Sequence, residues 1–100
     1  MIKFLGHASI YIKTDTTSLV TDPWFSKKGA FLSTWFQFPD NTDIDFSWKD
    51  DLDYVCISHE HQDHFDLYFL KTLNKNTQIV IPNYKNKRFF NSIKDNLPNH

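Results

Sequence analysis

The feature that most constrains this chain is a cluster of histidines and carboxylates that directly follows an apolar run. The run 53–57, DYVCI, is short, β-branched and aromatic and stops abruptly at polar residues, which predicts a buried strand. Three of the five histidines of the chain follow within the segment 58–66, SHEHQDHFD. The candidate functional residues therefore lie on the loop at the C-terminal end of a strand.

The spacing inside this loop predicts a metal site. Residues two apart in extended backbone point to the same side, so His59 and His61 can direct both imidazoles at one point. Asp63 and His64 lie just past the bend and can face a second point. Imidazole and carboxylate suit zinc and related metals at catalytic sites, and the loop holds no cysteine that would indicate a structural zinc knuckle. The alternative is a solvated histidine-rich loop without metal.

The segment His59-x-His61-x-Asp63-His64 resembles the HxHxDH metal motif of the metallo-β-lactamase superfamily. The opening FLGHAS at 4–9 and the run VTDPW at 20–24 are similar to the lactonase-like and N-acyl phosphatidylethanolamine phospholipase D-like branches. The run 19–24, an aromatic insert and the histidine loop also look like the metallo-β-lactamase-like part of CMP-N-acetylneuraminate hydroxylase. Residues 1–83 fall within the resemblance.

The resemblance implies a metal-dependent hydrolase that uses a metal-activated water on a lactone, phosphodiester or sugar-nucleotide-type small molecule. It implies two zinc ions in the complete domain, with manganese or iron as alternatives. His59 and His61 would hold one ion, and Asp63 and His64 the other. Asp63 is also the candidate catalytic residue, because it can take up a proton during turnover.

The remaining ligands of the superfamily come from well downstream, whereas His100 is the only later histidine and lies closer to the motif than the family pattern implies. We therefore expect residues 1–100 to form a single partial metallo-β-lactamase-like domain that belongs to a longer enzyme and is incomplete when isolated. The alternative is a non-catalytic metal-binding or interaction half-domain that lacks the downstream ligands.

The periodicity predicts an α/β fold, which by resemblance is the N-terminal half of an αββα sandwich. Three strands are expected over 2–5, 9–13 and 18–21, with buried positions at Ile10, Ile12, Leu19 and Val20. Asp66 can cap a helix that reaches about Leu73 and buries one face. A buried strand over 78–82 and an amphipathic helix over 84–97, ended by Pro98, complete the pattern. The inward residues expected on this last helix are Phe89, Phe90, Ile93 and Leu97.

The connection 24–48 carries eight aromatic residues with neither a helical nor an alternating period. A connection of this length without secondary structure is typical of a lid or binding loop, so we expect an insert that folds over the mouth of the site. Packing against the core, a wall for a sugar or acyl group, and a membrane-facing patch are the three explanations for its composition.

His7 and Asp22 follow neighbouring predicted strands and should lie near the rim that holds the metals. Each could hold a ligand in position or contact the substrate. Asp22 can orient a ligating imidazole through its free N–H, and the alternative is a turn residue before Pro23. For His7 the alternative is a histidine satisfied by backbone groups near Gly6.

Composition excludes several classes of protein. A formal charge of −1 over 100 residues gives no electrostatic case for binding nucleic acid. No apolar run reaches the about 20 residues of a membrane span, and a cytoplasmic location is the default. The single cysteine, Cys56, is expected to be a small core residue. Strands that are apolar on both faces predict pairing with the missing C-terminal half or with a second copy as a homodimer.

Overall fold

The computed structural model describes residues 1–97, so the expectations for Pro98 and His100 fall outside the described residues. The elements are β1 (Ile2–Gly6), β2 (Ser9–Lys13), β3 (Ser18–Thr21), the 3-10 helix η1 (Ser47–Asp51), β4 (Tyr54–Cys56), α1 (Leu67–Leu70), β5 (Gln78–Val80) and α2 (Arg88–Asn96). Among the described residues, neither α-helix has the length and apolar character needed to cross a membrane.

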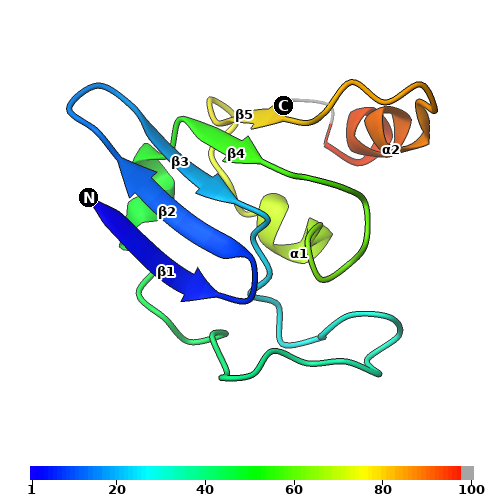
Figure 1. Ribbon diagram of the computed structural model, residues 1–100, viewed down its shortest axis with the longest axis horizontal. Helices are drawn as coiled ribbons and strands as arrows, with labels where there is room; N and C mark the ends of the chain where they lie inside the picture. The colour runs from blue at the N-terminus through cyan, green and yellow to red at the C-terminus, as the bar shows by residue number, and fades with distance from the viewer. Residues whose placement is uncertain (98–100) are drawn as a thin grey trace.

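The strands form one five-stranded sheet in the order β1-β2-β3-β4-β5 (Figure 1). β2 pairs antiparallel with both β1 and β3, whereas β3, β4 and β5 pair in parallel. Because β1 and β3 both run against β2, every strand except β2 points the same way. The C-terminal ends of β1, β3, β4 and β5 therefore meet at one edge of the sheet.

The core lies on one face of the sheet, and both helices cover that face. Val20 and Val55 are fully buried in the sheet, and side chains from the two helical segments pack against them. The helical contribution consists of Phe65, Phe69, Leu70, Leu73, Phe89, Ile93 and Leu97. A mixed sheet with helices on one face is the half α/β arrangement that the sequence predicts.

The opposite face of the sheet, which we call the outer face, leaves apolar side chains exposed. Ile2 and Phe4 are 73% and 70% exposed, and Val80 at the far side of the sheet is 46% exposed. Ile10, which faces Phe4 across the β1–β2 pair, belongs to the same face. The expectation that Ile10 is buried is therefore wrong, because strand alternation turns its neighbour Tyr11 toward the core instead.

The other strand residues that we expected to be buried lie on different faces of the sheet. Val20 is buried as predicted, whereas Ile12 and Leu19 pair with each other on the outer face and are half-buried. The expected strands at 53–57 and 78–82 shorten to β4 and β5.

The helices are shorter than the periodicity predicts. α1 ends at Leu70, although Leu73 remains buried in a following turn. α2 begins at Arg88 rather than at Tyr84, because the Asn86 side chain accepts a hydrogen bond from the Arg88 N–H (2.9 Å) and forms a local turn. Phe90 is 51% exposed and not inward, because it follows the buried Phe89 by about 100° around the helix.

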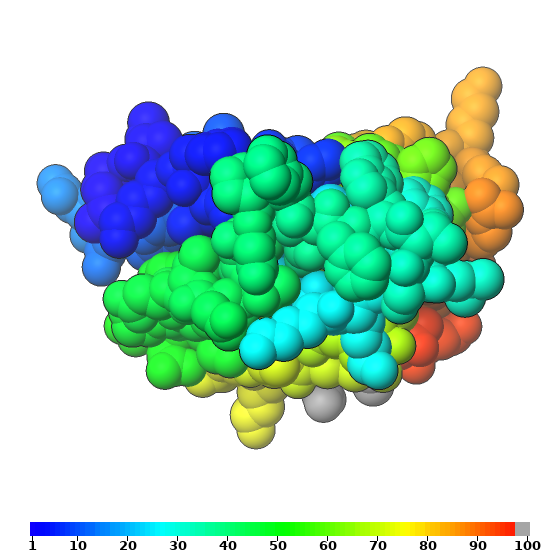
Figure 2. All heavy atoms as spheres, turned by 90° about the horizontal axis from the view of Figure 1, so that it is seen from below, coloured from blue at the N-terminus to red at the C-terminus, as the bar shows by residue number. Residues whose placement is uncertain are grey.

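The insert 24–48 is largely irregular, and its aromatic residues divide into two groups. Trp24 and Phe25 are buried, and Phe46 and Trp48 pack against the core, so packing explains these four. The others are exposed: Phe31, Trp35, Phe36 and Phe38. Figure 2 shows residues of the insert, coloured cyan to green, spread over the face seen in that view.

Candidate metal centre

Three segments that are distant in sequence meet at the edge where the parallel-running strands end. His7 follows β1, Asp22 follows β3, and the loop 58–64 follows β4. The backbone holds this edge together, since the Asp22 N–H donates to the Cys56 carbonyl at 2.9 Å and the Ile57 N–H donates to the Val80 carbonyl at 2.9 Å.

Two groups of side chains at this edge could hold a metal ion. One consists of His59, His61 and Asp63, and the other of His7, Asp63 and His64; in each group the ligand atoms all lie within 4.8 Å of one another. Asp63 belongs to both groups and is only 6% exposed. The four residues of the sequence motif thus come together, and His7 joins them.

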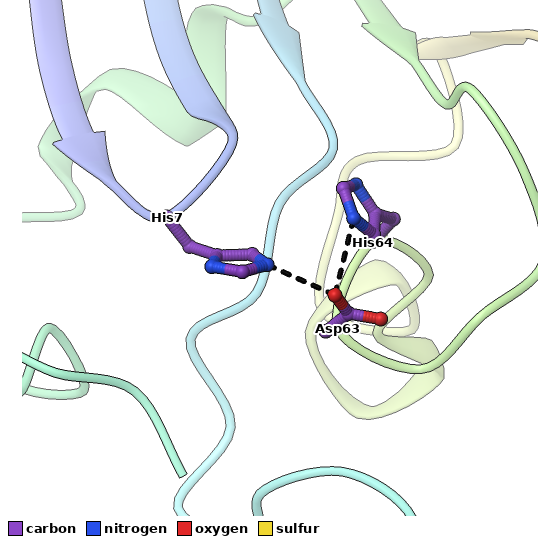
Figure 3. Close-up of side chains that lie close together, drawn as sticks. All are labelled: His7, Asp63 and His64. Atoms are coloured by element: carbon purple, nitrogen blue, oxygen red, sulfur yellow. Dashed lines mark hydrogen bonds and ion pairs between the residues drawn. The ribbon is translucent and has the colours of Figure 1, made fainter. Parts of the chain in front are cut away.

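In the second group, two histidine nitrogens lie close to one carboxylate oxygen. The Oδ2 atom of Asp63 lies 2.9 Å from Nε2 of His7 and 3.1 Å from Nε2 of His64 (Figure 3). The two groups adjoin, because the rings of His59 and His64 are 4.2 Å apart and those of His59 and His61 are 4.8 Å apart.

Asp22 contacts two residues of the loop 58–64. Its Oδ2 atom lies 3.1 Å from Nδ1 of His64 and accepts the Ser58 hydroxyl hydrogen bond at 2.9 Å. Its Oδ1 atom accepts from the Ser58 N–H at 2.6 Å. This contact to the far nitrogen of His64 has the geometry that an imidazole-orienting role requires.

Both His7 and Asp22 have left-handed backbone conformations, with φ of 54° and 36°. Gly6 precedes His7 with φ of 115°, a region that essentially only glycine adopts without strain. A Cβ atom at Gly6 would also lie 2.7 Å from Nδ2 of Asn41. The turn that presents His7 to the site thus depends on this glycine.

The insert 24–48 contacts the loop 58–64. The Phe31 N–H donates a hydrogen bond to the Gln62 side chain, and the Phe31 and His61 rings lie 6.3 Å apart. A hollow of about 530 Å³ lies beside His61, lined by Phe31, Leu32, Glu60, His61, Gln62 and Arg88. The exposed part of the insert therefore borders the candidate site.

Several contact residues at this edge were not singled out from the sequence. Ser58 was recognisable in principle, since it follows β4 at the same edge as Asp22. Tyr84 follows β5, and its hydroxyl donates to the Ser58 carbonyl. Arg88 pairs with Glu60, with its Nε atom 2.9 Å from the carboxylate. No sequence pattern links Gln62 to Phe31.

Cys56 lies in β4 as expected, but it is half-buried and does not belong to the core cluster, so the expectation that it is a core residue is wrong. Burial raises the pKa of the Cys56 thiol, and the negative charge of Asp22 raises it further. Among the described residues, Cys56 belongs to neither of the two groups that could hold a metal ion. The donors at this edge are thus imidazole nitrogens and a carboxylate oxygen, a set that fits a zinc-like divalent metal.

The chain matches the family described as "Beta-lactamase superfamily domain" over residues 1–94, and it belongs to this superfamily. Membership usually means a metal-dependent hydrolase, and the histidine and aspartate groups above are compatible with that. The α/β half-sandwich expected from the sequence is confirmed at the level of the family and the mixed sheet.

Several curated proteins align with most of this chain. A protein of Mycolicibacterium smegmatis named "Putative Rieske 2Fe-2S iron-sulfur protein" is 38% identical over 81 residues, which cover 80% of this chain and 15% of that protein. A protein of Mycobacterium tuberculosis with the same description is 37% identical over 81 residues, again 80% and 15%. N-acyl-phosphatidylethanolamine-hydrolyzing phospholipase D 1 of Caenorhabditis elegans is 32% identical over 80 residues, 76% of this chain and 22% of the enzyme.

The matched part of this chain therefore spans about a sixth to a fifth of the length of these relatives, 15% to 22%. No solved structure gives a significant match.

Proposed function

We propose that this chain carries the metal centre of a metal-dependent hydrolase, with His59, His61, Asp63 and His64 as ligands. The observation that supports the proposal most directly is the convergence of these side chains on Asp63, at the edge where four strands end. Zinc is the proposed metal, with manganese and iron as alternatives, because imidazole and carboxylate donors suit all three.

A divalent metal held here would supply Lewis acidity and activate water for attack on the substrate. The protein residues have distinct tasks. With Nε2 of His64 on the metal, Nδ1 would carry the proton and donate to Asp22 Oδ2, 3.1 Å away, which would fix the tautomer of His64. Asp63, buried between the two groups, joins them and is the proposed catalytic residue that can take up a proton.

The proposed substrate is a small molecule with a lactone, phosphodiester or sugar-nucleotide-type bond. The printed name of the worm relative supports the phosphodiester class. The hollow beside His61 combines apolar Phe31 and Leu32 with the ion pair of Glu60 and Arg88, which suits a molecule that has both an apolar and a polar part. Residues 24–48 would then act as a lid or wall of a partial domain that extends over 1–100.

The first prediction tests the metal centre itself. Calorimetry near pH 7 should show that the double variant His59→Ala, His61→Ala loses the zinc ion held by the group of His59, His61 and Asp63. Affinity of the wild type should also fall in acid, because ligating imidazoles must be unprotonated.

The variant His100→Ala is the matched control, since it removes a histidine outside the motif and should leave zinc affinity unchanged. Circular dichroism of each variant separates loss of ligands from loss of folding. Equal zinc stoichiometry and affinity in the double variant and the wild type would reject the site.

A second candidate function is a metal-binding half-domain that serves for association rather than catalysis. The exposed apolar outer face of the sheet favours it, because an uncovered face of this kind marks an interaction surface. The two candidates differ in turnover. Metal-dependent hydrolysis of lactone or phosphodiester compounds by a longer form that contains residues 1–100 favours the enzyme, and its absence favours the association module.

A further inference from the structure

An imidazolium has two donor nitrogens and could satisfy both carboxylate contacts of His64, whereas a neutral His64 has a conflict that a metal ion removes. Its Nδ1 atom lies 3.1 Å from Asp22 Oδ2, and its Nε2 atom lies 3.1 Å from Asp63 Oδ2. A neutral imidazole has one donor and one acceptor nitrogen, so it can donate to only one of the two carboxylates. The other nitrogen then places its lone pair against a carboxylate oxygen. A cation between Nε2 and Asp63 turns this unfavourable contact into a pair of metal bonds.

His7 faces the same oxygen from the opposite side. Its Nε2 atom lies 2.9 Å from Asp63 Oδ2, and its ring centroid lies 5.3 Å from that of His64. In a tetrahedral zinc site with bonds of about 2.0–2.1 Å, neighbouring ligand atoms are about 3.3 Å apart. The separations of 2.9 Å and 3.1 Å around Asp63 Oδ2 are close to that edge length, and the ligand atoms of His7 and His64 lie within 4.8 Å of each other, so one ion can bring the three atoms together.

The surroundings of His7 hold its ring in this direction. The indole of Trp24 meets the His7 ring edge-on at a centroid distance of 5.0 Å, and the indole of Trp35 meets it at 5.5 Å. The left-handed conformation of His7, with φ of 54°, aims the side chain out of the β1–β2 turn toward the loop after β4 (Figure 3). A histidine satisfied by local backbone groups needs none of these arrangements.

We propose that His7 is itself a metal ligand, which binds through Nε2 the ion that Asp63 and His64 hold. This inference rests on the proposed metal function and extends it. The resulting set of His7, Asp63 and His64 supplies three protein ligands from within this chain and leaves a fourth position open, as catalytic zinc sites do. The competing explanation is that His7 only donates a hydrogen bond to Asp63 and thereby positions it.

The direct test is nitrogen-15 NMR of the imidazole rings in the zinc-loaded wild-type chain, with the His7 signals assigned by their loss in His7→Gln. Long-range proton–nitrogen correlations distinguish a metal-bound ring nitrogen from a protonated one. The expected result is an unprotonated, zinc-bound Nε2 in His7. A His7 Nε2 that keeps its proton in the zinc-loaded protein overturns the proposal.

Metal stoichiometry gives a second readout. His7→Gln retains an N–H donor near the former Nε2 but is a poor zinc ligand, so a positioning role should survive this change and a ligand role should not. We expect two bound zinc ions in the wild type and one in His7→Gln and His7→Ala. Zinc affinity at the site of His7, Asp63 and His64 should fall by more than about 100-fold, because losing a residue that only orients a ligand costs at most about that much. Two tightly held zinc ions in His7→Gln overturn the ligand role.

The variants also separate this proposal from the metal function on which it rests. The double variant His59→Ala, His61→Ala should keep the ion at His7, Asp63 and His64, whereas His7→Gln should keep the ion at the other group. A wild-type chain that binds no zinc overturns both proposals, and a wild type that binds zinc without a change at His7 overturns only this one.

Discussion

At the scale of single residues, the site depends on backbone conformations that few side chains adopt. Gly6, His7 and Asp22 all have positive φ and lie at the edge where the metal residues meet. Backbone strain of this kind costs of order 1–3 kcal/mol per residue and persists only where surrounding contacts impose it. The contacts are visible here, since His7 touches Asp63 and Asp22 touches both Ser58 and His64.

Gly6→Ala should destabilise the chain by roughly 1–3 kcal/mol, because the new Cβ combines a disfavoured φ of 115° with a contact of 2.7 Å to Asn41 Nδ2. It should also weaken zinc binding at His7, since the turn that presents His7 must shift. Urea unfolding and zinc calorimetry measure the two effects.

Asn41→Ala supplies the control as a double-mutant cycle, since it removes the atom that the new methyl group would meet. Part of the loss in Gly6→Ala should be recovered when both changes are combined. Strictly additive losses would show that the steric contact with Asn41 does not contribute.

The sequence predicts the residues of the site unevenly, and distance along the chain explains why. His59, His61, Asp63 and His64 are close in sequence, so their spacing alone brings them together. His7 lies 56 residues from Asp63, and only the direction of β1 places the two side by side. The predicted strand order places His7 at the same edge of the sheet as the metal loop, but it does not give the distance between His7 and Asp63. The sequence therefore suggested only a supporting or substrate-contacting role for His7.

At the scale of secondary-structure elements, Asp66 connects α1 to the insert. It accepts a hydrogen bond from the Phe69 N–H at 3.2 Å and so caps α1, as the sequence predicts. The same carboxylate accepts from the N–H groups of Phe25 at 3.0 Å and Ser26 at 2.8 Å. With only 4% exposure, Asp66 holds the start of the insert against the helix that follows the metal loop.

Asp66→Asn should lower the free energy of unfolding by about 1–3 kcal/mol, because one carboxylate oxygen becomes an NH₂ group that cannot accept from a buried N–H. Urea unfolding followed by circular dichroism measures the change. Asp40→Asn is the control, since Asp40 is exposed within the same insert. It accepts hydrogen bonds from the N–H of Thr42 at 2.9 Å and from the Thr42 hydroxyl at 2.8 Å. A loss in Asp40→Asn equal to that in Asp66→Asn would contradict the connecting role.

Element type was predictable, whereas element length was not. The strands 9–13 and 18–21 have the predicted bounds, because alternation and turn residues delimit them locally. The helix expected from Tyr84 begins only at Arg88, since the side chain of Asn86 competes for a backbone N–H that the helix would otherwise use. The insert carried no period, so the separation of its core-packing residues from its exposed ones depends on tertiary contacts alone.

At the scale of the whole molecule, one face of the sheet is covered and the other is not. The helices and the start of the insert pack on the core face. The outer face exposes Ile2, Phe4 and Val80, and the insert contributes exposed aromatics of its own such as Phe38. Apolar surface of this kind is usually buried against a partner.

The 100-residue chain should therefore self-associate at micromolar concentration through its outer face, which sedimentation velocity measures directly. Phe4→Lys should shift the chain toward monomer, because it places a charge where Phe4 is 70% exposed on that face. Phe38→Lys is the matched control: Phe38 is 96% exposed but belongs to the insert, so association should persist. A wild type that sediments as a monomer and unfolds cooperatively would show that the outer face needs no partner.

Within residues 1–97, β1 is an edge strand that pairs with β2 alone, and such a strand is ordinarily the first part of a sheet to fray. The contact between His7 and Asp63 ties the end of this strand to the loop after β4. An ion shared by those two side chains would stabilise β1 without adding any contact within the sheet. Local opening at the N-terminus and release of the ion would then be one event, so that occupancy of the site and order of the first strand rise and fall together.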